Sequence, residues 1–273
     1  MRLTYIFHSG FALETARCVL IFDYWMDPAR VVPSVLSAGK PVYVFASHFH
    51  EDHFSPKILR WRDDYPQCRF TYILSKDILK RRRAIAEAAD VWLAKGSSWQ
   101  DDNIKVCATG SNDSGVSWVV EIAPDGGSSK PFRLFHAGDL NNWYARFLTD
   151  DFPGGTIMSE EFGEIDPIRD EKLYLGELKD IRRTVQSLAS LQPDADRDFD
   201  LVMFPIDGRI GNGYTRGGRQ FIDRFKVGLF VPMHFVASGF HSAWRMKEFT
   251  DEKQIPFWSI SQEGESIELV PQI

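Results

Sequence analysis

Three histidines and two carboxylates fall within six consecutive residues, His48-Phe49-His50-Glu51-Asp52-His53. The chain of 273 residues contains only 7 histidines, so this clustering calls for a chemical reason. Protonated imidazoles this close would repel one another, whereas a bound cation keeps them unprotonated together. Neutral imidazole combined with carboxylate suits zinc, manganese or iron. A polar loop that caps the next helix is the alternative, but capping needs one side chain and favours Ser, Thr, Asp or Asn over His.

The segments on either side indicate that this cluster lies at the end of a strand. Residues 41–46 are typical of a buried strand, and Ser55-Pro56 begins a helix expected over residues 56–62. In extended backbone His48 and His50 face the same way, and the turn that follows can bring Asp52 and His53 toward a second position. The sequence therefore predicts one or two divalent cations.

The form His-X-His-X-Asp-His resembles the metal motif of the metallo-β-lactamase superfamily, and two later segments resemble its other motifs in the same order. Residues 132–139 resemble the strand that ends at a bridging aspartate, here Asp139. Residues 227–234 resemble the strand that ends at a late histidine, here His234. Residues 8–11 and 19–23 resemble the opening of the branch that contains L-ascorbate-6-phosphate lactonase. The resemblance implies an αββα sandwich with a hydrolytic metal site.

One departure from the family pattern concerns the first metal position. The family places a further histidine between the first motif and the bridging aspartate, whereas residues 109–121 contain none. Asn112 lies near the expected position, and Asp113 is the nearest residue with an anionic oxygen. Residues 111–114 either form only a turn, which Asn, Asp, Ser and Gly favour, or also supply a ligand. The implied ligands are Asp52, His53, Asp139 and His234 at one position, and His48, His50, Asp139 and, in the second case, Asp113 at the other.

This ligand set predicts hydrolysis of a small ester, lactone or phosphate ester by a metal-bound hydroxide. Coordination lowers the pKa of water from 15.7 to roughly 7, so no nucleophilic Ser or Cys is required. Asp52 is expected to handle the proton of that water, and the branch resemblance places His8 where it can protonate a leaving group. The expected ion is zinc or manganese, with iron as a further option.

Other functions remain open in the sequence. The missing histidine supports a catalytically impaired binding module with an incomplete metal site. Di-iron oxidoreductase chemistry is less supported, because position 50 carries no carboxylate and no flavin domain is appended.

Several further side chains allow two interpretations. His136 is expected to support a ligand or to be packed rather than to bind metal, because strand alternation turns it away from Asp139. Arg209 either pairs with Asp207 or holds an anionic substrate group. His241 is expected at the surface or in a helix cap. Residues 150–170 either cover the site as a lid or connect elements along the surface.

Composition limits the classes of partner. The formal charge of −6 and the pI near 5.7 argue against a nucleic-acid surface, and the basic run at residues 80–83 is expected to be a solvated helix face. Three scattered cysteines indicate no disulfide framework. Neither a secretory signal nor a membrane span is visible, so we expect a cytoplasmic protein with a small-molecule substrate and no membrane partner. Self-association into a homo-oligomer is left open.

The pattern of elements predicts an α+β fold. Strand-like runs occur at residues 3–7, 19–24, 41–46, 69–74, 104–108, 116–122, 132–136, 201–205 and 229–231. Helical periodicity occurs at residues 56–62, 76–89, 171–191, 215–225 and 241–253. A hydrophobic content of 44% and the lack of a linker predict one domain over residues 1–273. We expect two mixed sheets packed face to face with helices on the outer faces, a four-layer αββα sandwich.

Overall fold

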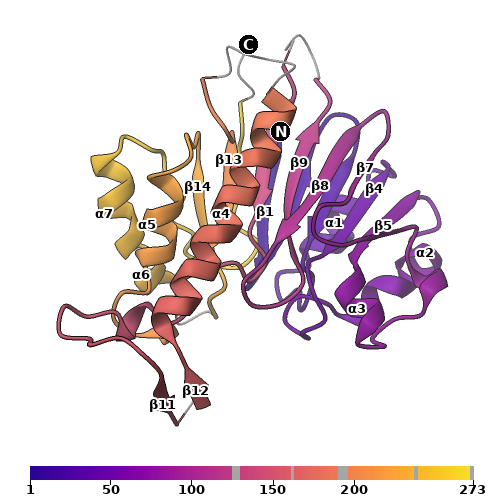
Figure 1. The fold of residues 1–273 in the computed structure, drawn as a ribbon. Helices are drawn as coiled ribbons and strands as arrows, with labels where there is room; N and C mark the ends of the chain where they lie inside the picture. Colours follow the sequence, from indigo (N-terminus) through magenta and orange to yellow (C-terminus); the bar gives the residue numbers. More distant parts are fainter. Residues whose placement is uncertain (125–129, 161–162, 190–195, 237–238, 271–273) are drawn as a thin grey trace.

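Two mixed β-sheets pack face to face at the centre of the molecule, which a computed structural model describes for residues 1–124, 130–160, 163–189, 196–236 and 239–270 (Figure 1). The first sheet, in the order β15-β1-β2-β3-β4-β5-β6, contains β1 (Arg2–Phe7), β2 (Gly10–Glu14), β3 (Val19–Phe22), β4 (Val42–Ala46), β5 (Phe70–Ser75), β6 (Val91–Leu93) and β15 (Ser266–Glu268). The second sheet, in the order β14-β13-β10-β9-β8-β7, contains β7 (Ser98–Gln100), β8 (Ile104–Gly110), β9 (Val116–Ile122), β10 (Phe132–His136), β13 (Leu201–Pro205) and β14 (Phe230–Met233). A separate hairpin is formed by β11 (Ile157–Ser159) and β12 (Gly163–Ile165).

Helices cover the outer faces of both sheets (Figure 1). The first sheet packs against α1 (Val31–Leu36), the 3₁₀ helix η1 (Pro56–Arg60), α2 (Trp61–Asp64) and α3 (Lys76–Lys80). The second packs against α4 (Pro167–Ala189), α5 (Arg216–Ile222), α6 (Phe240–Ala243) and α7 (Arg245–Glu252). Short 3₁₀ turns are η2 (Ala86–Ala88), η3 (Ala145–Phe147) and η4 (Gly208–Ile210). Within the described ranges no helix combines the length and the apolar character needed to cross a membrane.

Strand and helix periodicities account for these layers. Along β4, Tyr43 and Phe45 enter the core between the sheets, whereas Val44 enters the core beneath the first helical layer. On α4 a single apolar stripe at i, i+3 and i+4 spacing faces the second sheet; its members are Tyr174, Leu178, Ile181, Val185 and Leu188. The predicted αββα sandwich is confirmed.

Three predicted helices differ from the structure in extent or continuity. The helix expected over residues 56–62 is the 3₁₀ helix η1 followed by α2. The helix expected over residues 76–89 ends at Lys80, because Arg82 adopts a left-handed φ of 55° and Ile85 is 70% exposed, so no apolar stripe continues. The helix expected over residues 241–253 is divided at Trp244 into α6 and α7. The strands of three residues, such as β6 and β7, are too short for the alternating pattern that reveals longer strands.

Candidate metal centre

The residues of the candidate site come from strand ends at one edge of the sandwich. β3, β4 and β5 run parallel in the first sheet, and β10, β13 and β14 run parallel in the second. His48, Asp139 and His234 each follow the carboxyl end of one of these strands, β4, β10 and β14 respectively. Ligand sites in open α/β sheets commonly form at such ends. The topology therefore gathers motifs that lie up to 186 residues apart in the sequence, from 48 to 234.

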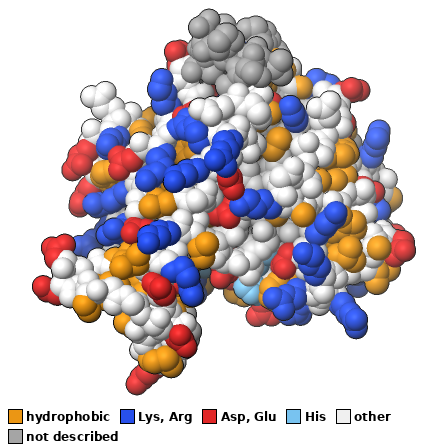
Figure 2. Space-filling model, in the orientation of Figure 1, with side chains coloured by type: hydrophobic (Ala, Val, Ile, Leu, Met, Phe, Trp, Pro, Cys, Tyr) orange, Lys and Arg blue, Asp and Glu red, His pale blue; other side chains and the backbone are white. Residues whose placement is uncertain are grey.

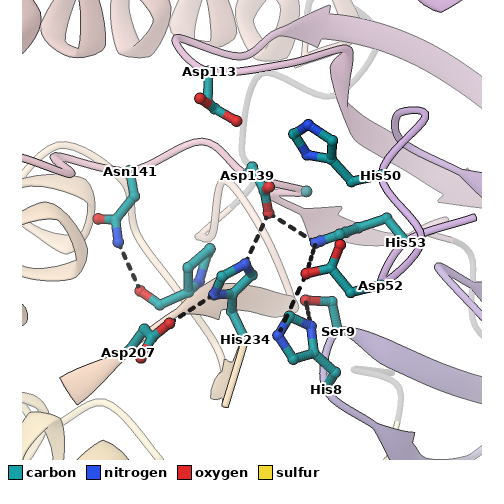
Figure 3. Close-up of polar contacts among 12 residues, drawn as sticks. His8, Ser9, His50, Asp52, His53, Asp113, Asp139, Asn141, Asp207 and His234 are labelled. Atoms are coloured by element: carbon teal, nitrogen blue, oxygen red, sulfur yellow. Dashed lines mark hydrogen bonds and ion pairs between the residues drawn. The ribbon is translucent and has the colours of Figure 1, made fainter. Parts of the chain in front are cut away.

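Asp139 lies at the centre of the cluster (Figure 3). Its Oδ1 is 3.0 Å from Nε2 of His53 and 3.3 Å from Nε2 of His234, and its Oδ2 is 3.1 Å from Nε2 of His48. Burial raises the pKa of Asp139, but the three imidazoles outweigh that effect and hold it well below its usual value. Burial by itself lowers the pKa of the His53 imidazole. The carboxylates of Asp139 and Asp23 outweigh burial, so the pKa is raised well above its usual value. Asp139 thus places two carboxylate oxygens among three imidazole nitrogens, the donor types that hold a divalent cation.

These donors fit a divalent cation. Nε2 of His53 and Oδ1 of Asp139 face each other across 3.0 Å, yet neither atom has a hydrogen bond within the described part of the chain. Buried polar atoms without partners cost free energy, and a cation would satisfy both. Nitrogen ligands of tetrahedral zinc at about 2.0–2.1 Å lie about 3.3 Å from one another, close to the separations around Asp139. Three groups of side chains each place their donor atoms within 4.8 Å of one another. They are His8, Asp52, His53 and His234; His48, His53 and Asp139; and His50, Asp113 and Asp139.

His234 is fixed from its far side by Asp207. Nδ1 of His234 lies 3.0 Å from Oδ2 of Asp207, which leaves Nε2 facing Asp139. Burial lowers the pKa of His234, but Asp139 and Asp207 outweigh it and raise the value to about 9. Asp207 also accepts two hydrogen bonds from Nε of Arg209 and one, at 2.7 Å, from Nη2. The expected ion pair between Asp207 and Arg209 is therefore present, and it supports a candidate ligand.

Asp23 orients His53 in the same manner, and the sequence reasoning did not assign it a role. Its carboxylate is fully buried and lies 2.7 Å from Nδ1 of His53. It also accepts hydrogen bonds from the backbone N–H and the hydroxyl of Ser47, at 2.8 and 2.6 Å. These bonds keep Nδ1 of His53 protonated and its Nε2 directed toward Asp139. An unusual backbone, with φ of 41° at a non-glycine residue, marks the position.

We expect Asp23→Asn to lower metal affinity by roughly 10- to 100-fold, because losing the acceptor of a ligand histidine frees its tautomer and its orientation. Competition against a zinc-sensitive dye measures the affinity. The matched control is Asp101→Asn, which removes the acceptor of the Tyr43 hydroxyl at the opposite end of β4. Equal affinities of Asp23→Asn and the wild type would contradict a supporting role for Asp23.

His8 and Asp52 face each other beside the same cluster (Figure 3). Nε2 of His8 lies 3.8 Å from Oδ2 of Asp52, and that oxygen lies 3.9 Å from Nε2 of His53. Burial, reinforced by His234, lowers the pKa of His8, so its imidazole is neutral near neutral pH. A neutral imidazole suits a ligand or a proton acceptor, and the role of His8 as a leaving-group acid stays a prediction. The Asp52 side chain is 30% exposed and is the more accessible of the two.

Two glycines allow the loops to meet. Gly115 has a φ of 66°, and a Cβ built on it would lie 2.1 Å from the carbonyl oxygen of Ser47 and 2.5 Å from Cβ of His48. Gly138 has a φ of 54°, and its Cβ would lie 2.9 Å from Cβ of Ser47. Both positions therefore need glycine for conformation as well as for space.

Asn112 and Asp113, in the segment that lacks the further histidine of the family pattern, have different surroundings. The side chain of Asn112 donates to the carbonyl oxygen of Asn141 at 2.8 Å and accepts from its backbone N–H at 3.2 Å, so it pins two loops together. Asp113 instead points toward His50 and Asp139 (Figure 3). Its pKa is raised, first by desolvation and then by Asp139. The structure thus brings Asp113, and not Asn112, to the candidate first position.

We expect Asp113→His to tighten zinc binding roughly tenfold at the weaker position, because an imidazole would replace an exposed carboxylate beside His50. Asn112→His serves as the matched variant and should not tighten it, because that side chain is committed to Asn141. Zinc titration of the apo-protein measures both. Tightening by Asn112→His alone would contradict the placement of Asp113.

The remaining candidates lie away from the cluster or support it. His136 is buried; its Nε2 lies 2.9 Å from the carbonyl oxygen of Ser9, and its ring stacks on Phe22. His241 is exposed near the start of α6 and contacts Trp244. Residues 150–170 contain the β11–β12 hairpin and the start of α4, except that residues 161–162 lie outside the described ranges, and the lid remains a prediction.

The chain is similar to known proteins at the level of three-dimensional structure. No protein-family model matches the chain, and no curated protein sequence matches it significantly. The metallo-hydrolase Igni18 from the archaeon Ignicoccus hospitalis is similar with a TM-score of 0.57 and 16% identity, over 98% of this chain and 99% of that one. The metallo-β-lactamase fold protein YhfI from Bacillus subtilis gives 0.54 and 12%, over 97% and 98%. An isothiocyanate hydrolase from Delia radicum gut bacteria gives 0.51 and 12%, over 98% and 99%. The chain therefore has the metallo-β-lactamase fold.

Proposed function

We propose that the protein is a metal-dependent hydrolase of a small ester, lactone or phosphate ester. The observation that carries the proposal is the buried Asp139 carboxylate with three imidazole nitrogens within 3.3 Å, two of which are held by the carboxylates of Asp23 and Asp207. Such a set serves a cation better than it serves packing, because it leaves buried donor atoms facing one another without hydrogen bonds within the described residues. Igni18 and the isothiocyanate hydrolase are described as hydrolases on the same fold, which supports this reaction class.

The cation would be held by His53, Asp139 and His234 with Asp52 or His8, and a second by His48, His50 and Asp139 with Asp113. When bound, such an ion supplies a Lewis acid that polarises the attacked carbonyl or phosphoryl oxygen and acidifies water. The mixed nitrogen and oxygen donors suit zinc or manganese, with iron also compatible.

The chain itself performs the positioning and the proton transfer. Asp52 is a partly exposed carboxylate at the cluster, and its Oδ2 faces both His8 and His53, so it is placed to accept the proton of an attacking water. Burial keeps the His8 imidazole neutral, and its Nε2 lies 3.8 Å from Oδ2 of Asp52. The ring centre of Trp25 lies 5.5 Å from that of His8. The β1–β2 turn that carries His8 resembles the lactonase branch, which supports a lactone among the substrates.

We expect turnover of a panel of lactones, aryl esters and phosphodiesters to depend on added Mn²⁺ or Zn²⁺. The metal-depleted protein should lose the activity, and readdition should restore it. Elemental analysis of the same samples gives the metal content. Full metal content without turnover on any substrate would instead support a binding module that has lost catalysis, and no bound metal would overturn the metal-dependent assignment.

A further inference from the structure

One edge of the Arg209 guanidinium makes no hydrogen bond to the described residues and lies beside the candidate metal ligands. Its Nε and Nη2 bind both oxygens of Asp207 at 2.7 to 3.0 Å, so one edge of the guanidinium is occupied. Within the described ranges Nη1 has no hydrogen-bond partner. The side chain is 59% exposed although its carboxylate partner is only 5% exposed. The arginine is therefore fixed in place by a buried group while its outer edge faces solvent.

Asp207 connects the guanidinium of Arg209 to the candidate metal ligand His234. Oδ2 of Asp207 accepts from Nη2 of Arg209 at 2.7 Å and lies 3.0 Å from Nδ1 of His234. Arg209 also acts electrostatically on His8, Asp52 and Asp139. The guanidinium thus lies at the rim of the same cluster, on the side formed by η4 and β14.

A planar guanidinium held along one edge suits recognition of an anion. Arginine binds carboxylates and phosphates through paired N–H donors, and here the Asp207 bonds fix the direction of the free donors before a ligand arrives. Such preorganisation reduces the entropy lost on binding. Two other cations lie near the motif: the guanidinium carbons of Arg81 and Arg83 are 4.8 and 5.9 Å from the centre of the Phe49 ring, and no described carboxylate pairs with either. Figure 2 shows histidine atoms at the lower edge of this face, with both basic and acidic side chains close by.

We propose that Arg209 binds an anionic group of the substrate, a carboxylate or a phosphate separate from the bond that is cleaved. This inference rests on the proposed hydrolase function and names its substrate class: a small acidic ester or lactone. Asp207 acts as the positioning residue of both Arg209 and His234. One carboxylate therefore aligns the anion-binding group with the candidate metal ligands.

The test compares two para-nitrophenyl esters that differ in the charge at the end of the acyl chain away from the ester bond. Para-nitrophenyl hexanoate is neutral, and mono-para-nitrophenyl adipate ends in a carboxylate on a chain of the same length. We expect Arg209→Gln to lower the ratio of kcat/KM for the adipate ester to that for the hexanoate ester about tenfold, mainly through KM, because a charge-assisted hydrogen bond is lost. Arg209→Lys should recover part of the ratio, since it keeps the charge and loses the planar edge.

The matched control is Arg182→Gln, which removes an arginine of α4 that pairs with Asp198 and stacks on Phe225. It should leave the ratio unchanged. If Arg209→Gln slows both esters equally, the residue only supports Asp207 and the inference is overturned. A fall in the ratio with Arg81→Gln, and none with Arg209→Gln, would also overturn it.

A binding measurement separates this inference from the proposed function. Calorimetric titration of metal-loaded protein with adipate, which has no ester bond, should give a Kd about tenfold higher for Arg209→Gln than for the wild type and for Arg182→Gln. That result stands even if no ester is hydrolysed, in which case the proposed hydrolase fails and the anion site remains. Equal Kd values for the three proteins would reject the anion site whatever the activity.

Discussion

Asp139→Ala is expected to remove most of the bound metal, with affinity at least roughly 100-fold weaker than in the wild type. Its carboxylate is buried among the imidazole nitrogens of His48, His53 and His234, and belongs to two of the three donor groups. One substitution therefore takes a ligand from both candidate positions. Elemental analysis after dialysis against a weak chelator measures the loss.

The control for this variant is Asp251→Ala, which removes an exposed carboxylate from an i,i+4 ion pair on α7. It should retain metal in full. Thermal unfolding of both apo-proteins reports whether each variant folds, because a folded Asp139→Ala with low metal content isolates the ligand role. Full metal content in folded Asp139→Ala would remove the basis of the proposed centre.

The fold was predictable because its layers follow from local periodicity. Alternation along β4 and the apolar stripe of α4 each identify a buried face, and these faces define the αββα layers. The helix expected over residues 76–89 failed where tertiary contacts did not support the pattern, at the exposed Ile85. The extent of the domain and the location of the protein in the cell stay predictions.

The candidate ligands were predictable for a different reason: their residue types and spacings fall within short motifs. The supporting residues were not. Asp23 reaches His53 only because β3 and β4 pair in parallel with Phe22 opposite Phe45, and Asp23 then lies beside Ser47. Asn112 likewise holds Asn141, which is 29 residues away. Such contacts depend on strand register and loop packing, which a single sequence does not encode locally.

The second large effect is expected from Asp52→Asn, which should reduce kcat by roughly 10² to 10⁴ while the protein keeps more metal than Asp139→Ala. The two carboxylates differ in environment. Asp139 is buried at 3.0 to 3.3 Å from its imidazole neighbours, whereas Asp52 is 30% exposed and its Oδ2 lies 3.8 to 3.9 Å from His8 and His53. Asparagine preserves the shape of the side chain and can still offer an oxygen, but it cannot take up a proton.

Steady-state kinetics and metal content, measured on the same preparation, separate the roles. Asp113→Asn is the matched comparison, since it neutralises the other accessible aspartate of the donor groups. It should weaken the position beside His50 and reduce kcat far less than Asp52→Asn, because Asp52, unlike Asp113, belongs to the donor group that contains His8. If the loss of kcat in Asp52→Asn merely parallels its loss of metal, then Asp52 is a ligand without a proton-transfer role.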